Sequence, residues 1–213
     1  MGQKREIPPA LQKLLALDVH LTNQFCIWAN HFLPLKSLRI HYKFLEVSCH
    51  GVPWIAAWLA FIWLWDHPSL YQMQMNFLIG LLLDIVLVAV LKAVTRRRRP
   101  VANKSDMFGV VGPDKFSFPS GHASRATMVA CFFLWVWPVH FLFQGPILAW
   151  AGSVCLSRLL LQRHHILDVT AGVLLGVFET WFIYNIVWLS QESATWAVSW
   201  LSDERTDGGS YHV

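Results

Sequence analysis

The sequence reads NFLIGLLLDIVLVAVLKAV from Asn76 to Val94, and this stretch decides the class of fold. Its length is close to the about 20 apolar residues that a helix needs to cross the hydrocarbon core of a bilayer. The whole chain has 213 residues, of which 55% are hydrophobic and 14% charged, against about 25% charged residues in an ordinary soluble domain. The composition therefore predicts a membrane protein, and the length predicts one domain.

Four further apolar stretches resemble membrane helices. They cover residues 52–65, 123–143, 146–162 and 166–189. Inside lipid the chain must satisfy its own backbone hydrogen bonds, and a helix does so within one segment. We therefore predict an all-α, polytopic membrane helical bundle of five transmembrane helices, with a sixth, membrane-embedded helix at the N-terminus.

The two ends of the chain have a different pattern from the middle. Residues 9–33 and 35–50 carry apolar residues at helical spacing, interrupted by polar ones, as in helices that lie in the membrane surface. We predict N-terminal amphipathic, interfacial helices over residues 1–50, a membrane core over 51–190, and an interfacial and then flexible tail over 191–213. The start of the chain lacks the pattern of a cleaved signal peptide, so we expect the first membrane helix to act as its own signal.

Positive charge is concentrated on one side of this predicted topology. Residues 1–50, 92–125 and 158–165 hold 16 of the 17 Lys and Arg residues. The positive-inside rule then places these segments on the cytoplasmic face. The four cysteines have no CxxC spacing, and no cluster of metal-ligating residues is evident, so we expect neither a metal site nor a cofactor.

The first polar stretch on the basic side follows the span at 76–94. If that helix continues, Lys92 and Arg99 share a face, with Arg96 beside them and with Arg97 and Arg98 directed elsewhere. A lysine point charge and an arginine fork suit a phosphoryl group. A basic cluster that only stops membrane transfer is the alternative interpretation.

The second stretch is Pro119-Ser120-Gly121-His122, directly before a predicted membrane helix. Free backbone N–H groups at a helix N-terminus bind anions, and the Ser120 hydroxyl adds another donor. His122 would then lie beside the bound anion. An ordinary N-cap with an incidental histidine is the alternative.

The third stretch contains Ser157, Arg158, His164 and Asp168. A histidine four residues before an acid shares one face of a helix with it, so Asp168 could orient one ring nitrogen and leave the other free to attack. A purely structural pair is the alternative, and His165 could also pair with Asp168. Together the three stretches suit phosphoryl transfer to His164, with His122 as the acid that protonates the leaving oxygen and then activates water.

The patterns K-x6-R-P, P-S-G-H and S-R-x5-H-x3-D resemble the three motifs of the type 2 phosphatidic acid phosphatase (PAP2) superfamily. Two further features are similar to the polyisoprenoid (presqualene) diphosphate phosphatase branch. They are the run of arginines before Pro100 and the sequence KFSF, residues 115–118, which leads into P-S-G-H. The resemblance implies a metal-independent, multi-pass lipid phosphatase of the endoplasmic reticulum and nuclear envelope, with its site on the cytoplasmic face. It implies His164 as nucleophile, His122 as acid, Asp168 as orienting acid, and a set of phosphate ligands: Lys92, Arg99, Ser120, Gly121 and Arg158.

The arginines at 96–98 could meet a second phosphate, so we expect isoprenoid diphosphates such as farnesyl, geranylgeranyl and presqualene diphosphate as substrates. The alternatives are a phosphatidate, lysophosphatidate or sphingosine-phosphate monophosphatase, and a catalytically silent membrane regulator. We expect a lipid substrate and the bilayer as partners, no nucleic acid, and leave a homo-oligomer open. Asp84 and Glu179 lie within predicted spans, and we interpret both as buried, hydrogen-bonded residues.

Overall fold

The computed structural model describes residues 8–32, 35–100 and 116–206, with side chains for 8–31, 41–100 and 116–199. The regular elements of these ranges are helices. In addition, Arg98 and Phe116 form one isolated antiparallel bridge. Their bounds are α1 Pro9–Phe32, α2 Leu35–Ser48, α3 Gly51–Leu64, η1 Pro68–Leu70, α4 Tyr71–Thr95, α5 Gly121–Cys131, η3 Phe132–Val136, α6 Phe141–Leu160, α7 Ile166–Phe182, η4 Ile183–Val187 and α8 Gln191–Thr206. The prediction of an all-α bundle is confirmed.

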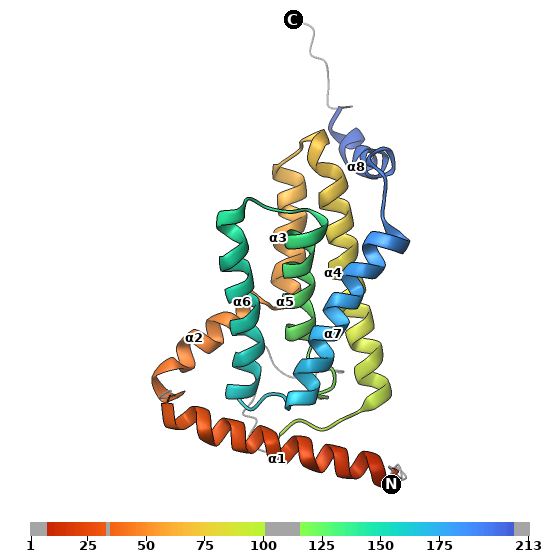
Figure 1. Cartoon of the computed structure of the whole chain (residues 1–213). Coiled ribbons are helices and arrows are strands. Elements are labelled where there is room, and N and C mark those ends of the chain that lie inside the picture. Colours follow the sequence, from red (N-terminus) through yellow and green to blue (C-terminus); the bar gives the residue numbers. More distant parts are fainter. Residues whose placement is uncertain (1–7, 33–34, 101–115, 207–213) are drawn as a thin grey trace, which may run out of the picture.

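Helices α3 to α7 run beside one another along the long axis of the molecule, and α5 lies among the others (Figure 1). Helix α5 packs against α4, α6 and α7. Helix α1 lies across one end of this bundle, α2 leads from α1 toward α3, and α8 lies at the opposite end. The division into interfacial N-terminal helices, a membrane core and a flexible tail stays a prediction.

The predicted helix over 123–143 is wrong in its bounds. Helix α5 continues only through the π-helical turn η3 to Val136, and α6 begins anew at Phe141. Pro138 lies in the break, where its ring and missing N–H prevent a helix from continuing. By length and composition, Pro68–Thr95 and Ile166–Val187 can each cross a membrane, and His41–Ser48 with Gly51–Leu64 adds a third span if the pair, bent by 55°, is counted as one.

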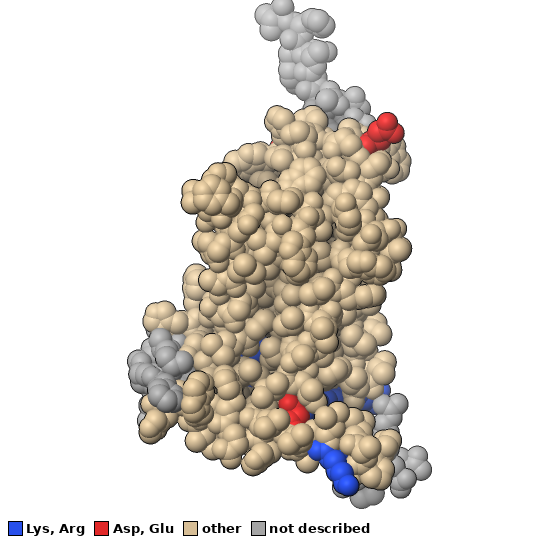
Figure 2. Space-filling view, in the orientation of Figure 1, with Lys and Arg blue, Asp and Glu red and all other residues tan. Residues whose placement is uncertain are grey.

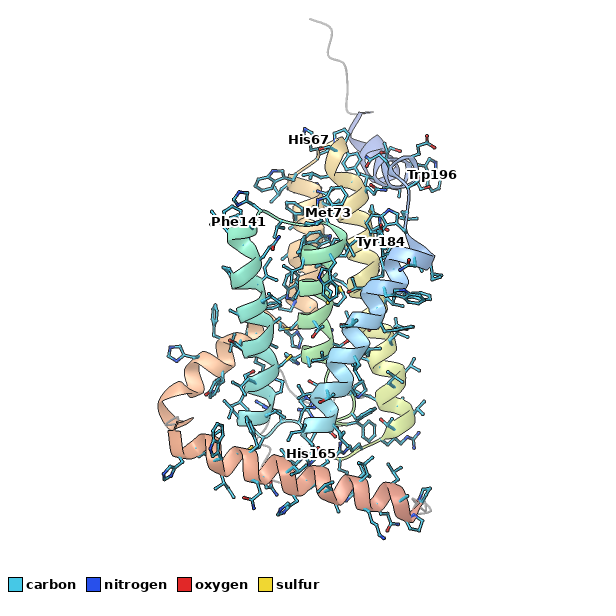
Figure 3. The ribbon with its side chains drawn as sticks, in the orientation of Figure 1. His67, Met73, Phe141, His165, Tyr184 and Trp196 are labelled. Carbon is cyan, nitrogen blue, oxygen red and sulfur yellow. The ribbon has the colours of Figure 1, made fainter. Side chains whose placement is uncertain are left out.

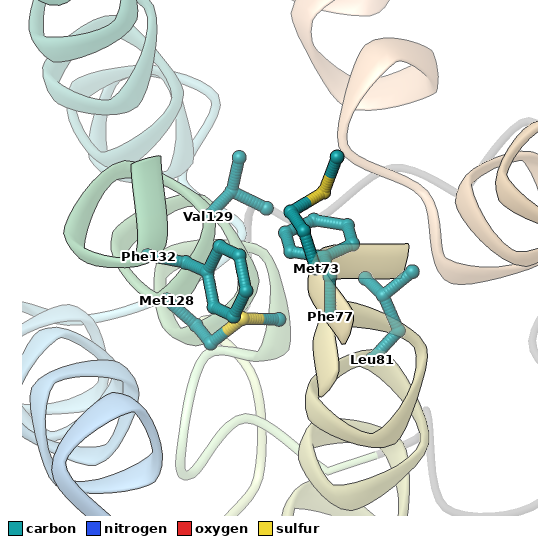
Figure 4. Close-up of a cluster of buried hydrophobic side chains, with 6 residues drawn as sticks. All are labelled: Met73, Phe77, Leu81, Met128, Val129 and Phe132. Carbon is teal, nitrogen blue, oxygen red and sulfur yellow. The ribbon is translucent and has the colours of Figure 1, made fainter. Parts of the chain in front are cut away.

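Two kinds of contact hold the centre of the bundle together. Met73, Phe77 and Leu81 of α4 pack against side chains from α5 and η3, namely Met128, Val129 and Phe132 (Figure 4). On its other side α5 approaches α7 so closely that a Cβ on Gly172 would lie 2.5 Å from the Ser120 carbonyl oxygen. Small residues permit such backbone contact between membrane helices. This contact fixes the first turn of α5 against α7.

The acidic residues inside the bundle are buried and hydrogen-bonded, as predicted. Asp84 is fully buried and accepts a hydrogen bond from Arg125 at 2.5 Å. Glu179 is also fully buried and accepts a hydrogen bond from the Ser124 hydroxyl at 3.2 Å. The interpretation of both acids as buried, hydrogen-bonded groups is confirmed.

Candidate active site

The three polar stretches meet at the end of the bundle that α1 covers. His165 lies at this end, and His67 and Trp196 lie at the other (Figure 3). The backbone N–H of Ser120 donates to the Asp168 carbonyl at 2.9 Å, which joins the second stretch to the third. The N–H of Ser117 donates to the Arg97 carbonyl at 2.8 Å, which joins the second to the first. The predicted convergence is therefore present.

The first stretch is not a continuous helix, and this corrects our prediction. Helix α4 ends at Thr95, and Arg96 takes a left-handed conformation with φ of 51°. The Thr95 hydroxyl lies 2.9 Å from the Phe118 carbonyl, so the end of α4 is attached to the segment before α5. Lys92 stays in the last helical turn and is buried. Arg99 lies past the helix end, so its place beside Lys92 is not set by helical periodicity.

Arg97 was expected to point away from the site, and this expectation is wrong. Its guanidinium donates to Asp168 at 2.7 Å and to Asp18 of α1 at 2.5 Å. The left-handed residue at Arg96 ends α4, and the following Arg97 contacts Asp168 of α7. The Arg97 guanidinium thus binds two carboxylates. Its planar, forked arrangement of N–H donors suits carboxylate oxygens.

The second stretch forms a helix N-terminus, as predicted. Ser120 is the N-cap of α5, and its hydroxyl accepts a hydrogen bond from the Ala123 N–H at 3.4 Å. His122 Nε2 lies 3.2 Å from the Glu46 backbone carbonyl on α2. A carbonyl oxygen can only accept, so Nε2 carries a hydrogen and Nδ1 is left for proton exchange with a ligand.

In the third stretch the helix begins later than our prediction requires. Helix α7 starts at Ile166 with His165 as its N-cap, so His164 precedes the helix and does not share its face with Asp168. The Asp168 carboxylate turns back instead to the N-cap, accepting from His165 N at 2.8 Å and lying 3.2 Å from His165 Nδ1. His164 Nδ1 is 3.9 Å from this carboxylate, beyond hydrogen-bonding distance.

A backbone carbonyl orients His164. Its Nδ1 lies 2.8 Å from the Ser117 oxygen, so Nδ1 donates and Nε2 keeps its lone pair. Burial, with 3% of the residue exposed, lowers the pKa of His164 well below its usual range, and the nearby charges of Arg99, Lys92 and Arg158 lower it further, against the opposing charge of Asp168. The ring is therefore neutral at physiological pH, with a free nitrogen suited to nucleophilic attack.

Arg158 supplies a buried donor for which the described residues offer no acceptor. The residue is 2% exposed, and its Nη2 has no hydrogen-bond partner among the residues that the structure describes. Glu46 holds the guanidinium from one side, with 3.7 Å between Nη1 and Oε2, and also accepts from Arg163 at 3.3 Å. Buried donors are normally paired, so the free Nη2 indicates a place for an anion.

Four residues hold the site together in ways that the sequence did not predict: Asp18, Glu46, Arg97 and Ser117. Both acids belong to the N-terminal helices, which the sequence predicts only as interfacial. Glu46 is the single acidic residue of 35–50, and such an isolated acid was a signal that could have been used. In the described part of the chain, no three His, Cys, Asp or Glu residues are grouped so as to hold a metal.

Known proteins are similar to this chain over the region that contains the three stretches. The family model described as the PAP2 superfamily matches residues 74–192, which include all three stretches. The chain is similar to the probable lipid phosphate phosphatase beta of Arabidopsis thaliana, with 32% identity over 200 residues, covering 79% of this chain and 88% of that protein. It is also similar to sphingosine-1-phosphate phosphatase 1 of Mus musculus, with 35% identity over 104 residues, covering 45% of this chain and 24% of that protein.

No solved structure matches the chain. The family model covers more than half of the sequence, and the plant relative is similar over most of its own length. The described structure brings the three matched stretches to one end of a helical bundle. The chain therefore belongs to the PAP2 superfamily and is a phosphatase.

Proposed function

We propose that the protein hydrolyses lipid monophosphates at the membrane surface without a metal, through a phosphohistidine on His164. The observation that carries this proposal is the neutral His164 ring, whose Nδ1 is bound to the Ser117 carbonyl, close to the buried Arg158, whose Nη2 has no hydrogen-bond partner among the described residues. Lys92, Arg99 and Arg158 supply the positive charge that the equatorial oxygens of a phosphoryl group need.

The reaction has two displacements. His164 Nε2 attacks phosphorus in line, and the bond from phosphorus to the lipid oxygen breaks. That oxygen takes the Nδ1 proton of His122, which enters this step protonated on both ring nitrogens beside the negative phosphate and leaves it neutral. Water then attacks the phosphohistidine, His122 accepts the proton from the water, and inorganic phosphate leaves as the P–N bond breaks. Because Nε2 of His122 faces the Glu46 carbonyl, Nδ1 is the atom that exchanges the proton. Ser120 and the N–H of Gly121, at the start of α5, are proposed as additional phosphate ligands.

We favour monophosphates over the isoprenoid diphosphates that the arginine run suggested. Arg97 is engaged by Asp168 and Asp18, and Arg96 Nε donates to the Ala93 carbonyl at 3.0 Å, so neither supports the idea of a second phosphate subsite. The names of the two relatives refer to lipid phosphate and to sphingosine 1-phosphate. The completeness of the site argues against a silent regulator.

A substrate panel tests this proposal on purified protein in detergent with EDTA. We expect phosphate release from phosphatidate or sphingosine 1-phosphate to exceed release from farnesyl diphosphate. His164→Ala should abolish turnover and the acid-labile phosphoryl label trapped on the wild type, because no other ring takes its place. His165→Ala should keep most activity, because the Asp168 carboxylate retains Arg97 and the His165 N–H.

Two results would contradict the proposal. A clear preference for farnesyl diphosphate would restore the diphosphate interpretation. A trapped label on His164→Ala protein, or wild-type activity that EDTA removes, would exclude the mechanism itself.

A further inference from the structure

We propose that α1 is a positioning element of the active site, and that Asp18 and Thr22 hold the segment carrying His164 and Asp168 in its reactive geometry. This inference rests on the proposed function, since it concerns the same site. Both residues lie before residue 74, outside the region that the family model matches. They therefore add to the motif residues and do not repeat them.

Two polar residues of helix α1, Asp18 and Thr22, are buried against the protein. Its buried stripe consists of Asp18, Thr22, Cys26 and Ala29, whereas Leu14, Leu17 and Leu21 are exposed. A carboxylate and a hydroxyl thus lie in the buried stripe, where a surface helix of a soluble protein usually carries apolar side chains. Burying a carboxylate is unfavourable unless it is paired, so the burial of Asp18 requires specific partners.

The partners are the first two N–H groups of α7. Asp18 Oδ1 accepts from Leu167 N at 3.0 Å, and Thr22 Oγ1 accepts from Ile166 N at 3.1 Å. These N–H groups have no acceptor within their own helix. The Thr22 hydroxyl hydrogen is directed to the Asp18 carbonyl at 2.7 Å, which leaves an oxygen lone pair for Ile166. Helix α1 thus caps α7 from another part of the chain.

A second contact links α1 to the other side of the site. Arg97 bridges Asp18 Oδ2 at 2.5 Å and Asp168 Oδ1 at 2.7 Å, and only 12% of its side chain is exposed. Asp18 therefore binds both the backbone of α7 and the cation that holds the Asp168 carboxylate. Removing Asp18 would release two contacts within one turn of His164.

The position of His164 depends on these contacts through a short segment. Only His165 separates His164 from Ile166, the residue that Thr22 caps. A small rotation of the first turn of α7 would move the attacking nitrogen away from its line with phosphorus. Misplacement by about 1 Å can reduce a rate about 100-fold while binding is kept.

The experiment compares Asp18→Ala and Thr22→Val with wild type in steady-state and single-turnover assays, with phosphatidate or sphingosine 1-phosphate in detergent. We expect kcat to fall about 10- to 100-fold and the rate of His164 phosphorylation to fall equally, with KM changed less than about threefold. Thr22→Ser keeps the hydroxyl and should restore most of the activity lost in Thr22→Val. Asn23→Ala changes an exposed residue of the same helix and should match wild type.

A double variant separates positioning from a general loss of folding. If Asp18 acts through Arg97, Asp18→Ala combined with Arg97→Met should be little worse than the more damaged single variant, because contacts shared by one network are not additive. Unchanged kcat in Asp18→Ala, or a loss that appears in KM alone, would overturn the inference. An inactive wild type would overturn the proposed function instead, so the two failures are distinguishable.

Discussion

At the residue scale, the proposed reactivity of His164 comes from its surroundings and not from its neighbour in sequence. The Ser117 carbonyl fixes the tautomer, and burial with three nearby cations keeps the ring neutral. Asp168 acts one step away, through His165 and Arg97. His164 and Asp168 belong to one sequence motif, but the contacts that orient their side chains include residues outside that motif, Ser117 and Arg97.

A pH profile tests this electrostatic arrangement. Only neutral His164 can attack, and its pKa lies below the ordinary value of about 6.5. The value of kcat/KM should therefore not decline through protonation of His164 until the pH is below about 6.5. Arg99→Gln removes a cation that lowers this pKa, so the acid limb of the variant should move to higher pH, together with a loss of about 100-fold in kcat/KM.

Profiles of the two proteins on one substrate provide the control, because the ionisation of the phosphate contributes equally to both. A limb that stays in place or moves to lower pH in Arg99→Gln would contradict a charge effect of Arg99 on His164. The same variant measured at high substrate concentration would show whether binding alone accounts for the loss.

At the element scale, the contact between α5 and α7 positions the turn at Ser120 and Gly121, which we propose to bind phosphate, against the helix that follows His164. A Cβ on Gly172 would meet the Ser120 carbonyl at 2.5 Å and the Ala123 Cβ at 3.0 Å. A Cβ on Gly176 would lie 2.8 Å from Met128 N. Backbone atoms cannot rotate away as side chains do, so the two helices would have to separate.

Gly172→Ala should therefore destabilise the protein by about 1–3 kcal/mol and reduce turnover, because the helix shift reaches Ser120. Gly152→Ala is the matched control: it lies within α6, and its added Cβ meets nothing within 4 Å. That change should stabilise by about 0.5–1 kcal/mol through helix propensity. Thermal unfolding of both purified variants in detergent, alongside phosphate release, measures the difference. Equal effects of the two changes would show that the close approach is unimportant.

At the scale of the whole molecule, charge and site share one end. The Lys and Arg residues visible in Figure 2 lie at the end that α1 covers. The apolar residues exposed on α1 suit a helix lying in the membrane surface, with the bundle extending into the bilayer. We propose that this end faces the cytoplasm, in the endoplasmic reticulum or nuclear envelope, where a lipid headgroup could reach His164 from the surface.

Glycosylation mapping tests this orientation. An acceptor sequence placed after Ser190 should be modified, because α8 lies at the end opposite the site (Figure 1). An acceptor placed within residues 103–115 should stay unmodified. Phosphatase activity of both tagged proteins would verify that each inserts normally. Modification of the second tag and not the first would reverse the assigned topology.

The sequence by itself determined the class of the protein and predicted most of the residues of the proposed site. Apolar runs of membrane-spanning length are local features, and they predict helices whatever those helices contact. The spacing within the three polar stretches is likewise local, so the convergence of Lys92, Ser120 and Arg158 at one end followed from the order of the spans. Helix ends were predicted less well, because Pro138 and the left-handed Arg96 end helices inside stretches that hydropathy alone joins.

Tertiary structure alone decided how the site is held. His164 bonds to a residue 47 positions earlier, Arg97 to Asp18 at a separation of 79, and Leu167 to Asp18 at a separation of 149. The periodicity of the sequence cannot predict these long-range hydrogen bonds, because they depend on where the ends of the folded helices lie. The arginine run suggested a second phosphate because the sequence does not show which partners Arg97 has. In the folded protein its partners are the carboxylates of Asp18 and Asp168.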